Sequence, residues 1–392
     1  MKDDTLMVHH GRDPERHSGV VNLPVYHAST ILYPTMEAFA RRAEGDAKYH
    51  SVRYGAYGTP TTHALANAVA ALEGGHGAVV TASGLAAVTL SIMAFVEQGD
   101  HILIVDSAYG PTRAYCDTVL KRFGVDTTYY DPLLGGKIAD LFQPNTRLVL
   151  TESPGSLTFE VQDIPAISAA AHQHDILVLM DNTWGTPLFF KPFTHGVDIS
   201  IQAGTKYIAG HSDLVAGMIT ARSESLLRQV KDTTMAIGDI AGPDDCYLAL
   251  RGLRSMGARL QRQQAAGLQV VQWLQAQPEV KRVLYPPLPE DPGHALWKRD
   301  FSGACSLFGV ILHTDSELAV AQMVDLYRYF KIGASWGGFE SLVTPAYPAQ
   351  MRTAVPWTET GFVLRYHVGL EDPDDLIADL DDGFRRLHQA LG

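Results

Sequence analysis

Between residues 62 and 203, short apolar runs alternate with amphipathic segments. The almost continuously apolar runs predict strands at 77–83, 101–106, 147–153, 176–181 and 197–202. Apolar residues at helical spacing predict intervening helices at 62–75, 85–98, 111–123 and 164–175. Strands that are apolar along their whole length are typical of a parallel sheet covered by helices on both faces. The pattern therefore predicts an α/β unit in this part of the chain.

The pattern changes before and after this unit. The first fifty residues lack a clear period and contain Pro24 and Pro34, which is typical of an arm that packs on another surface. From about residue 248 a long helix is followed by short strands and helices, as in a smaller α+β domain. We therefore expect an N-terminal arm, an α/β domain and a C-terminal α+β domain, at residues 1–56, 57–247 and 248–392.

Composition and charge narrow the possible partners. The 392 residues are 46% hydrophobic and 19% charged, as in ordinary globular proteins. A net charge of −12 argues against a nucleic-acid partner, and no apolar run has membrane-spanning length. Cys116, Cys246 and Cys305 are too far apart for a zinc motif, so we expect no metal site. Because three cysteines also do not suit a disulfide framework, we expect the protein to be located in the reducing cytoplasm.

Two of the predicted strands end in residues that could bind a ligand. In TASGLAAV, Ser83 and Gly84 separate a strand from a helix, so backbone N–H groups could approach an anion at the helix N-terminus. Asp181 closes an apolar run, where a carboxylate must be paired or face a cleft. A plain tight turn and a helix cap explain these features equally well, so neither is decisive alone.

Lys206 follows another apolar strand and precedes a loop of glycine, histidine and serine. A lysine with a lowered pKa at such a place can form a Schiff base with a carbonyl compound. Taken alone, the position is better explained by a lysine whose stem packs and whose ammonium group reaches water.

The turn at 83–84, Asp181 and Lys206 occur in the order found in fold-type I pyridoxal-phosphate (PLP) enzymes. The surrounding sequence resembles the Cys/Met-metabolism branch of these enzymes and, within it, the bacterial cystathionine β-lyases. The resemblance extends from about residue 20 to the C-terminus, through YGAYGTPTTHAL, SAYGPTRAYC, TESPGS, DNTWGTPLFFKP, SIQAGTKYIAGHSD, SWGGFESL and VLRYHVGLED. It implies a large domain with a mostly parallel seven-stranded sheet and a smaller α+β C-terminal domain.

The resemblance also implies a PLP site. Lys206 would hold the cofactor and act as acid and base, and Asp181 would pair with the pyridinium nitrogen. Tyr109 would stack on the ring and would also be one of the catalytic residues. The remaining cofactor contacts would be made to the phosphate, by Ser83, Gly84, Leu85 and Thr205.

The substrate would be an amino acid bound by the C-terminal domain. Arg365 would hold the α-carboxylate, and Ser335 and Trp336 would shape the pocket. Tyr54 would be a catalytic residue in the site of a neighbouring subunit. The implied assembly is a homotetramer built as a dimer of dimers.

The implied reaction converts L-cystathionine to homocysteine, pyruvate and ammonia, a step of methionine biosynthesis. A γ-type reaction (cystathionine γ-lyase, cystathionine γ-synthase or methionine γ-lyase) is the alternative, and an inactive PLP-fold binding protein belongs to a different class. Trp336 favours the β-lyase, because γ-type relatives usually have a smaller aliphatic residue there. Two residues depart from the family pattern. Ala56 occupies a position where the family often has an arginine that contacts the cofactor phosphate, and Ala334 occupies a position where the enteric enzymes have a tyrosine.

Overall fold

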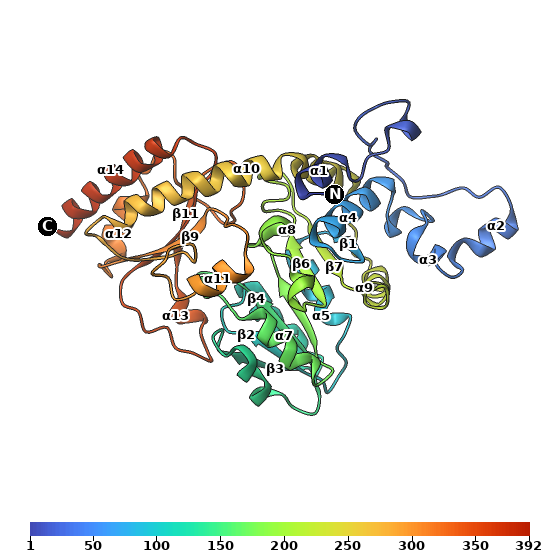
Figure 1. Ribbon diagram of the computed structural model, residues 1–392, viewed down its shortest axis with the longest axis horizontal. Helices are drawn as coiled ribbons and strands as arrows, with labels where there is room; N and C mark the ends of the chain where they lie inside the picture. Colours follow the sequence, from blue (N-terminus) through green and yellow to red (C-terminus); the bar gives the residue numbers. More distant parts are fainter.

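A seven-stranded sheet forms the centre of the large unit in the computed structural model, which describes residues 1–392 apart from the side chain of Ala47 (Figure 1). The strands are β1 (Gly77–Thr81), β2 (His101–Val105), β3 (Asp126–Tyr130), β4 (Thr146–Glu152), β5 (Leu177–Asp181), β6 (Ile199–Ala203) and β7 (Gly217–Ala221). Their order is β1-β7-β6-β5-β4-β2-β3, and only β7 runs antiparallel to its neighbours. The predicted mostly parallel seven-stranded sheet is confirmed.

Helices cover this sheet, and several of them begin at polar caps. They are α4 (Pro60–Glu73), α5 (Gly84–Met93), α6 (Gly110–Tyr115), α7 (Ile164–His172), α8 (Thr186–Phe189) and α9 (Glu224–Ile237). The side chains of Thr59, Ser83 and Asp163 accept N–H bonds at the starts of α4, α5 and α7. α4 ends at Gly74, whose φ of +77° suits glycine.

The C-terminal part contains a second sheet of five strands with helices packed on it. Its order is β10-β11-β12-β9-β8, with β8 (Val280–Leu284), β9 (Leu307–Leu312), β10 (Lys331–Ile332), β11 (Leu342–Ala346) and β12 (Val363–His367). The helices are α11 (His294–Asp300), α12 (Glu317–Val324), α13 (Pro348–Met351) and α14 (Pro373–Leu391). The predicted smaller α+β unit is confirmed.

α10 (Pro243–Gln275) runs from the large sheet to the C-terminal sheet (Figure 1). The expected boundary between residues 247 and 248 therefore lies inside a helix, and the division into three domains stays a prediction.

The N-terminal segment contains α1 (Asp3–His9), α2 (Met36–Ala40) and α3 (Ala47–His50). α1 belongs to the body of the molecule, because Met7 is buried against α10 and Arg254 donates to the carbonyls of Met7 and His10. Much of the segment up to α3 extends away from the body (Figure 1). Only this later part has the form expected of an arm.

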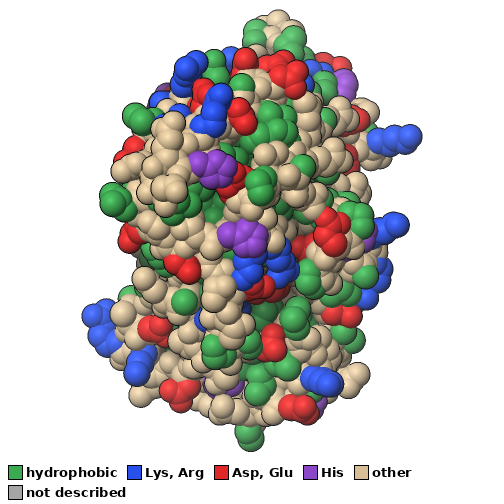
Figure 2. Space-filling model, turned by 90° about the vertical axis from the view of Figure 1, so that its left-hand side faces the viewer, with side chains coloured by type: hydrophobic (Ala, Val, Ile, Leu, Met, Phe, Trp, Pro, Cys, Tyr) green, Lys and Arg blue, Asp and Glu red, His purple; other side chains and the backbone are tan. Residues whose placement is uncertain are grey.

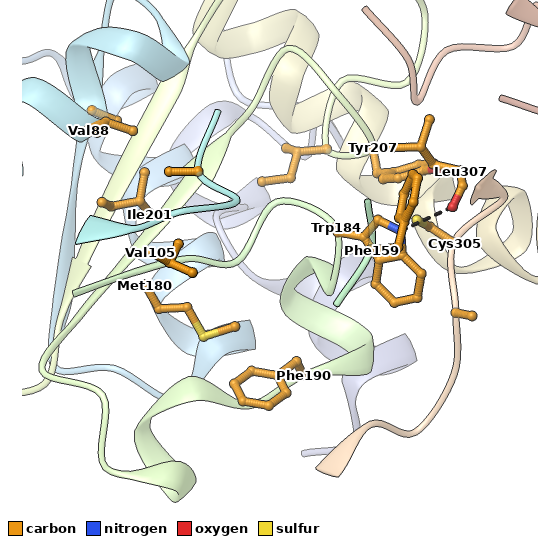
Figure 3. Close-up of a cluster of buried hydrophobic side chains, with 14 of the residues drawn as sticks. Val88, Val105, Phe159, Met180, Trp184, Phe190, Ile201, Tyr207, Cys305 and Leu307 are labelled. Atoms are coloured by element: carbon orange, nitrogen blue, oxygen red, sulfur yellow. Dashed lines mark hydrogen bonds between the residues drawn. The ribbon is translucent and has the colours of Figure 1, made fainter. Parts of the chain in front are cut away.

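An aromatic cluster joins the two sheets. Figure 3 shows Trp184 and Tyr207 of the large unit beside Cys305 and Leu307, and Trp184 Nε1 donates to the carbonyl of Leu307 at 3.2 Å. These four side chains are buried. The cluster fixes the C-terminal sheet next to the strand ends that carry Asp181 and Lys206.

The surface mixes charges of both signs. On the face formed by the C-terminal end of the chain, acidic and basic side chains are interspersed (Figure 2). Among the described residues, no helix is both long and apolar enough to cross a membrane.

Candidate active site

Glu152, Asp181 and Lys206 lie at the carboxyl ends of neighbouring strands. Glu152 and Asp181 end β4 and β5 and are partners in the strand register. Lys206 follows β6 in a turn closed by two bonds, from Lys206 N to the Ala203 carbonyl at 3.0 Å and from Gly210 N to the Lys206 carbonyl at 2.8 Å. In an open α/β sheet this edge is where ligands bind.

The Lys206 amine lies where the two sheets meet. Its Nζ donates to Ser335 Oγ at 2.5 Å and lies 5.3 Å from the centre of the Trp336 ring. Burial, together with the charge of Arg365, lowers the pKa of Lys206 to about 8, although Asp181 opposes this. The amine is therefore still mostly charged at pH 7, but a far larger fraction of it is neutral and nucleophilic than for an ordinary lysine.

Asp181 is fixed by Thr183. The Asp181 carboxylate accepts bonds from Thr183 N at 3.0 Å and from Thr183 Oγ1 at 2.5 Å, and Thr183 Oγ1 accepts from Ala203 N at 2.9 Å. Burial raises the pKa of Asp181, and these bonds and the Lys206 charge counteract the rise. A carboxylate held in this way can pair with a cationic ring nitrogen.

The first turn of α5 lies against β6. Ser83 caps the helix by accepting from Ala86 N at 3.0 Å. A Cβ on Gly84 would lie 2.7 Å from Ala203 Cβ, so glycine permits this close approach. The N–H groups of Gly84 and Leu85, as the first two of a helix, have no helical partner and can bind an anion.

Thr205 is placed differently from the other phosphate candidates. Its hydroxyl donates to the carbonyl of Ala216 at 3.2 Å and accepts from Ala216 N at 3.1 Å. The hydroxyl would have to turn away from Ala216 to donate to a phosphate.

Tyr109 presents a half-exposed ring just before α6. Its backbone N–H donates to Glu152 Oε2 at 2.7 Å. Burial and the nearby Asp181 raise the pKa of Glu152 well above its usual value. Sequence analysis gave Glu152 no place in the site, although its position at the end of an apolar run was an available signal.

Arg365 enters the site from β12. Its Nη2 donates to the Ser335 carbonyl at 3.2 Å and to Thr344 Oγ1 at 3.4 Å. None of the ion pairs among the described residues includes Arg365. A largely buried guanidinium with only these neutral acceptors is well suited to a substrate carboxylate.

Tyr54 lies apart from this group within one chain. It is half-exposed, and its ring packs edge-on against Tyr57 with ring centres 5.9 Å apart. The hollow that it lines is bordered by residues 27–29, 54–56, 59, 62 and 240–243, without Lys206 or Asp181. Nearby Arg53 is engaged with its own chain, since its Nε donates to the Lys48 carbonyl at 3.1 Å and its guanidinium lies 4.3 Å from the centre of the Tyr57 ring.

A family model for Cys/Met metabolism PLP-dependent enzymes matches residues 4–385. The chain belongs to this family. Cystathionine β-lyase MetC of Escherichia coli K12 is 40% identical over 392 residues, which cover 98% of this chain and 99% of the relative. An L-alanine/L-glutamate racemase of Wolbachia pipientis wMel is 41% identical over 399 residues, covering 99% and 98%.

A solved structure shares the whole fold. Cystathionine γ-synthase from Xanthomonas oryzae pv. oryzae, in complex with aminoacrylate and cysteine, aligns with a TM-score of 0.90 and 31% identity. The alignment covers 99% of each chain.

The residues present fit the family's cofactor. The site combines a lysine of lowered pKa, a fixed carboxylate, an open helix N-terminus and a half-exposed aromatic ring. Groups of these kinds would suit the aldehyde, the ring nitrogen, the phosphate and the ring face of PLP, respectively. The enzyme is therefore PLP-dependent.

Proposed function

We propose that this enzyme is a carbon–sulfur lyase that splits L-cystathionine and water into homocysteine, pyruvate and ammonia. The observation that carries the proposal is the Lys206 amine, which lies against Ser335 and near the unpaired Arg365. The identity to the E. coli cystathionine β-lyase supports the choice of substrate.

Lys206 would hold the cofactor and then move the proton of the substrate α-carbon. Its pKa of about 8 suits both tasks, because the amine can accept and return a proton near neutral pH. PLP, when bound, supplies the electron sink for the charge left on the α-carbon. Asp181 would keep the ring nitrogen protonated, and Tyr109 would stack on the ring.

The phosphate would lie at the first turn of α5, among Ser83, Gly84, Leu85 and Thr205. The α-carboxylate would pair with Arg365. Ser335 and Trp336 would border the rest of the substrate, and the Trp336 ring packs on Tyr207 with ring centres 5.5 Å apart.

We also propose that the enzyme works as a homotetramer, a dimer of dimers, in the cytoplasm. The extended arm exposes large apolar side chains, with Leu32 89% and Met36 84% exposed, which favours burial against another subunit. The three cysteines are buried and unpaired, in keeping with a reducing compartment.

Tyr54 would complete the site of a partner subunit, and mixed oligomers test this. A Tyr54→Phe variant and a Lys206→Ala variant, each of low activity, would be refolded together in equal amounts. If Tyr54 acts across the interface, half of the dimers contain one complete site, so about a quarter of the wild-type activity returns. Activity that stays at the sum of the two parents would place Tyr54 outside the partner's site.

Product identification from L-cystathionine tests the reaction itself. We expect pyruvate and homocysteine from the wild type and from Lys121→Ala, an exposed control, and neither product from Lys206→Ala. Predominant 2-oxobutyrate with cysteine would move the enzyme to the γ-lyase side. A purified holoenzyme without turnover would favour a binding protein.

A second candidate activity is amino-acid racemisation, favoured by the Wolbachia relative. Lys206 could remove the α-proton of alanine, and a proton returned to the opposite face would invert the centre. Incubation of L-alanine in D₂O would show D-alanine with deuterium at the α-carbon if the enzyme has this activity. Deuterated L-alanine without D-alanine would show proton exchange from one face only.

A further inference from the structure

One face of α10 passes behind the turn that carries Lys206. Gly252, Ser255, Arg259 and Gln263 recur along this face at spacings of three or four residues, as one stripe of a helix does. Arg259 is 6% exposed and Gln263 is fully buried. Buried polar side chains at this spacing call for specific partners.

The partners of Arg259 are backbone carbonyls. Its Nη2 donates to the carbonyls of Tyr207 and Gly252, both at 2.8 Å, and to that of Ile208 at 3.4 Å. Its Nε donates to Ser255 Oγ at 3.2 Å. No carboxylate among the described residues pairs with Arg259. Its guanidinium instead donates hydrogen bonds to the carbonyls of Tyr207 and Ile208, the two residues that follow Lys206.

Two glycines allow close packing around the same turn. A Cβ on Gly252 would lie 2.2 Å from the Ala209 carbonyl oxygen, and a Cβ on Gly337 would lie 3.0 Å from the Lys206 carbonyl carbon. α10 therefore lies directly against the backbone of the turn at residues 208–209, and the loop carrying Ser335 lies directly against the backbone of Lys206 itself.

The Ser335 loop is tied to the same helix one turn further on. Gln263 Nε2 donates to the Gly338 carbonyl at 2.8 Å. Gly337 N lies 3.1 Å from His367 Nε2, which also lies 3.2 Å from the Gly338 carbonyl oxygen. Arg259 and Gln263 thus hold the two segments whose side chains meet in the contact between Lys206 Nζ and Ser335 Oγ.

We propose that Arg259 is a positioning residue for Lys206: it clamps the turn after the lysine to α10 and so sets the Lys206 amine in register with Ser335. The guanidinium suits this task because its Nη2 donates to three carbonyls while its Nε donates to Ser255 Oγ. The ammonium group of a lysine has no second nitrogen that could hold Ser255 at the same time.

The first test measures the pKa of the Lys206 amine in the full-length apoenzyme. The rate of pulse acetylation of the Lys206 peptide, followed by mass spectrometry across pH, has a midpoint at the amine's pKa. Arg365 and Asp181 are the charged groups that act on this amine, and burial is the main cause of its low pKa. Loosening the turn hydrates the amine, so the midpoint should rise.

We expect Arg259→Met to raise the midpoint by about one pH unit and Arg259→Lys to raise it less. Arg262→Met is the matched control, because Arg262 lies on the same helix but is exposed and should leave the midpoint near 8. A folded Arg259→Met apoenzyme with an unchanged midpoint would overturn the proposal. If that variant does not fold, Arg259→Lys decides in the same way.

The second test uses the holoenzyme and rests on the proposed function. We expect Arg259→Lys to lower kcat on the order of tenfold with little change in KM, and to have less than about a twofold effect when Ser335 is already alanine. If Arg259→Lys lowered kcat equally with Ser335 present and with alanine at position 335, Arg259 would not act through the contact between Lys206 and Ser335. Absence of cystathionine turnover in the wild type would contradict the proposed function, while the acetylation midpoint would still test Arg259.

Discussion

Lys206 should destabilise the apoenzyme at neutral pH, and Lys206→Met should remove that penalty. The amine has a pKa of about 8 in the folded chain and 10.5 without the protein around it. At pH 7 it is mostly charged in both states, so burial of the charge costs the folded state roughly 3 kcal/mol, at about 1.4 kcal/mol per pKa unit. The cost is full below pH 8, shrinks between pH 8 and 10.5, and is absent above.

Methionine has a similar length and no charge, but it loses the bond to Ser335, worth about 1 kcal/mol. We therefore expect the Lys206→Met apoenzyme to be more stable than the wild-type apoenzyme by about 2 kcal/mol at pH 7 and by less than about 0.5 kcal/mol at pH 9.5. Urea unfolding of both apoenzymes at equal protein concentration measures the difference. A less stable variant at pH 7, or an advantage that does not shrink as the pH rises, would refute this reasoning.

Three further predictions concern the cofactor and the substrate. Lys206→Ala should abolish turnover, and borohydride should no longer fix PLP to the chain; substantial product release would contradict this role for Lys206. Arg365→Lys should raise KM for cystathionine strongly, because lysine keeps the charge but loses the bidentate geometry, and unchanged steady-state kinetics would argue against a carboxylate contact. Ala56→Arg should tighten PLP binding roughly ten- to 150-fold through charge-assisted bonds to the phosphate. Arg53→Ala should leave PLP binding nearly unchanged, since the Arg53 side chain is bound to residues of its own chain. PLP titration of the apoenzymes measures both affinities. A large loss of PLP affinity in Arg53→Ala, without a gain of affinity in Ala56→Arg, would mean that Arg53 already supplies the cation at the phosphate.

Sequence patterns predicted the strands of the large sheet that carry the site but missed two others in that sheet. β7 is a short, fully buried strand that begins at a glycine, and β3 is an edge strand of threonine and tyrosine. Neither has the long apolar run that marked the central strands. α1 was also missed, because its seven residues expose most side chains and only Met7 is buried.

The sequence by itself determined the α/β architecture, the glycine turn before α5, and the placement of Asp181 and Lys206 at strand ends. These features depend on neighbours along the chain, so periodicity and local residue type are enough to reveal them. The resemblance to PLP enzymes then named the residues of the C-terminal part.

Only the tertiary structure decided which of these residues meet. Ser335 contacts Lys206 across 129 positions of sequence, Glu152 holds the backbone of Tyr109 across 43, and Arg259 reaches the Lys206 turn from α10. The pKa of Lys206 is likewise a tertiary property, because it depends on burial and on Arg365 and Asp181. Such contacts follow from how the two sheets pack, and a local pattern carries no information about groups that approach only after packing.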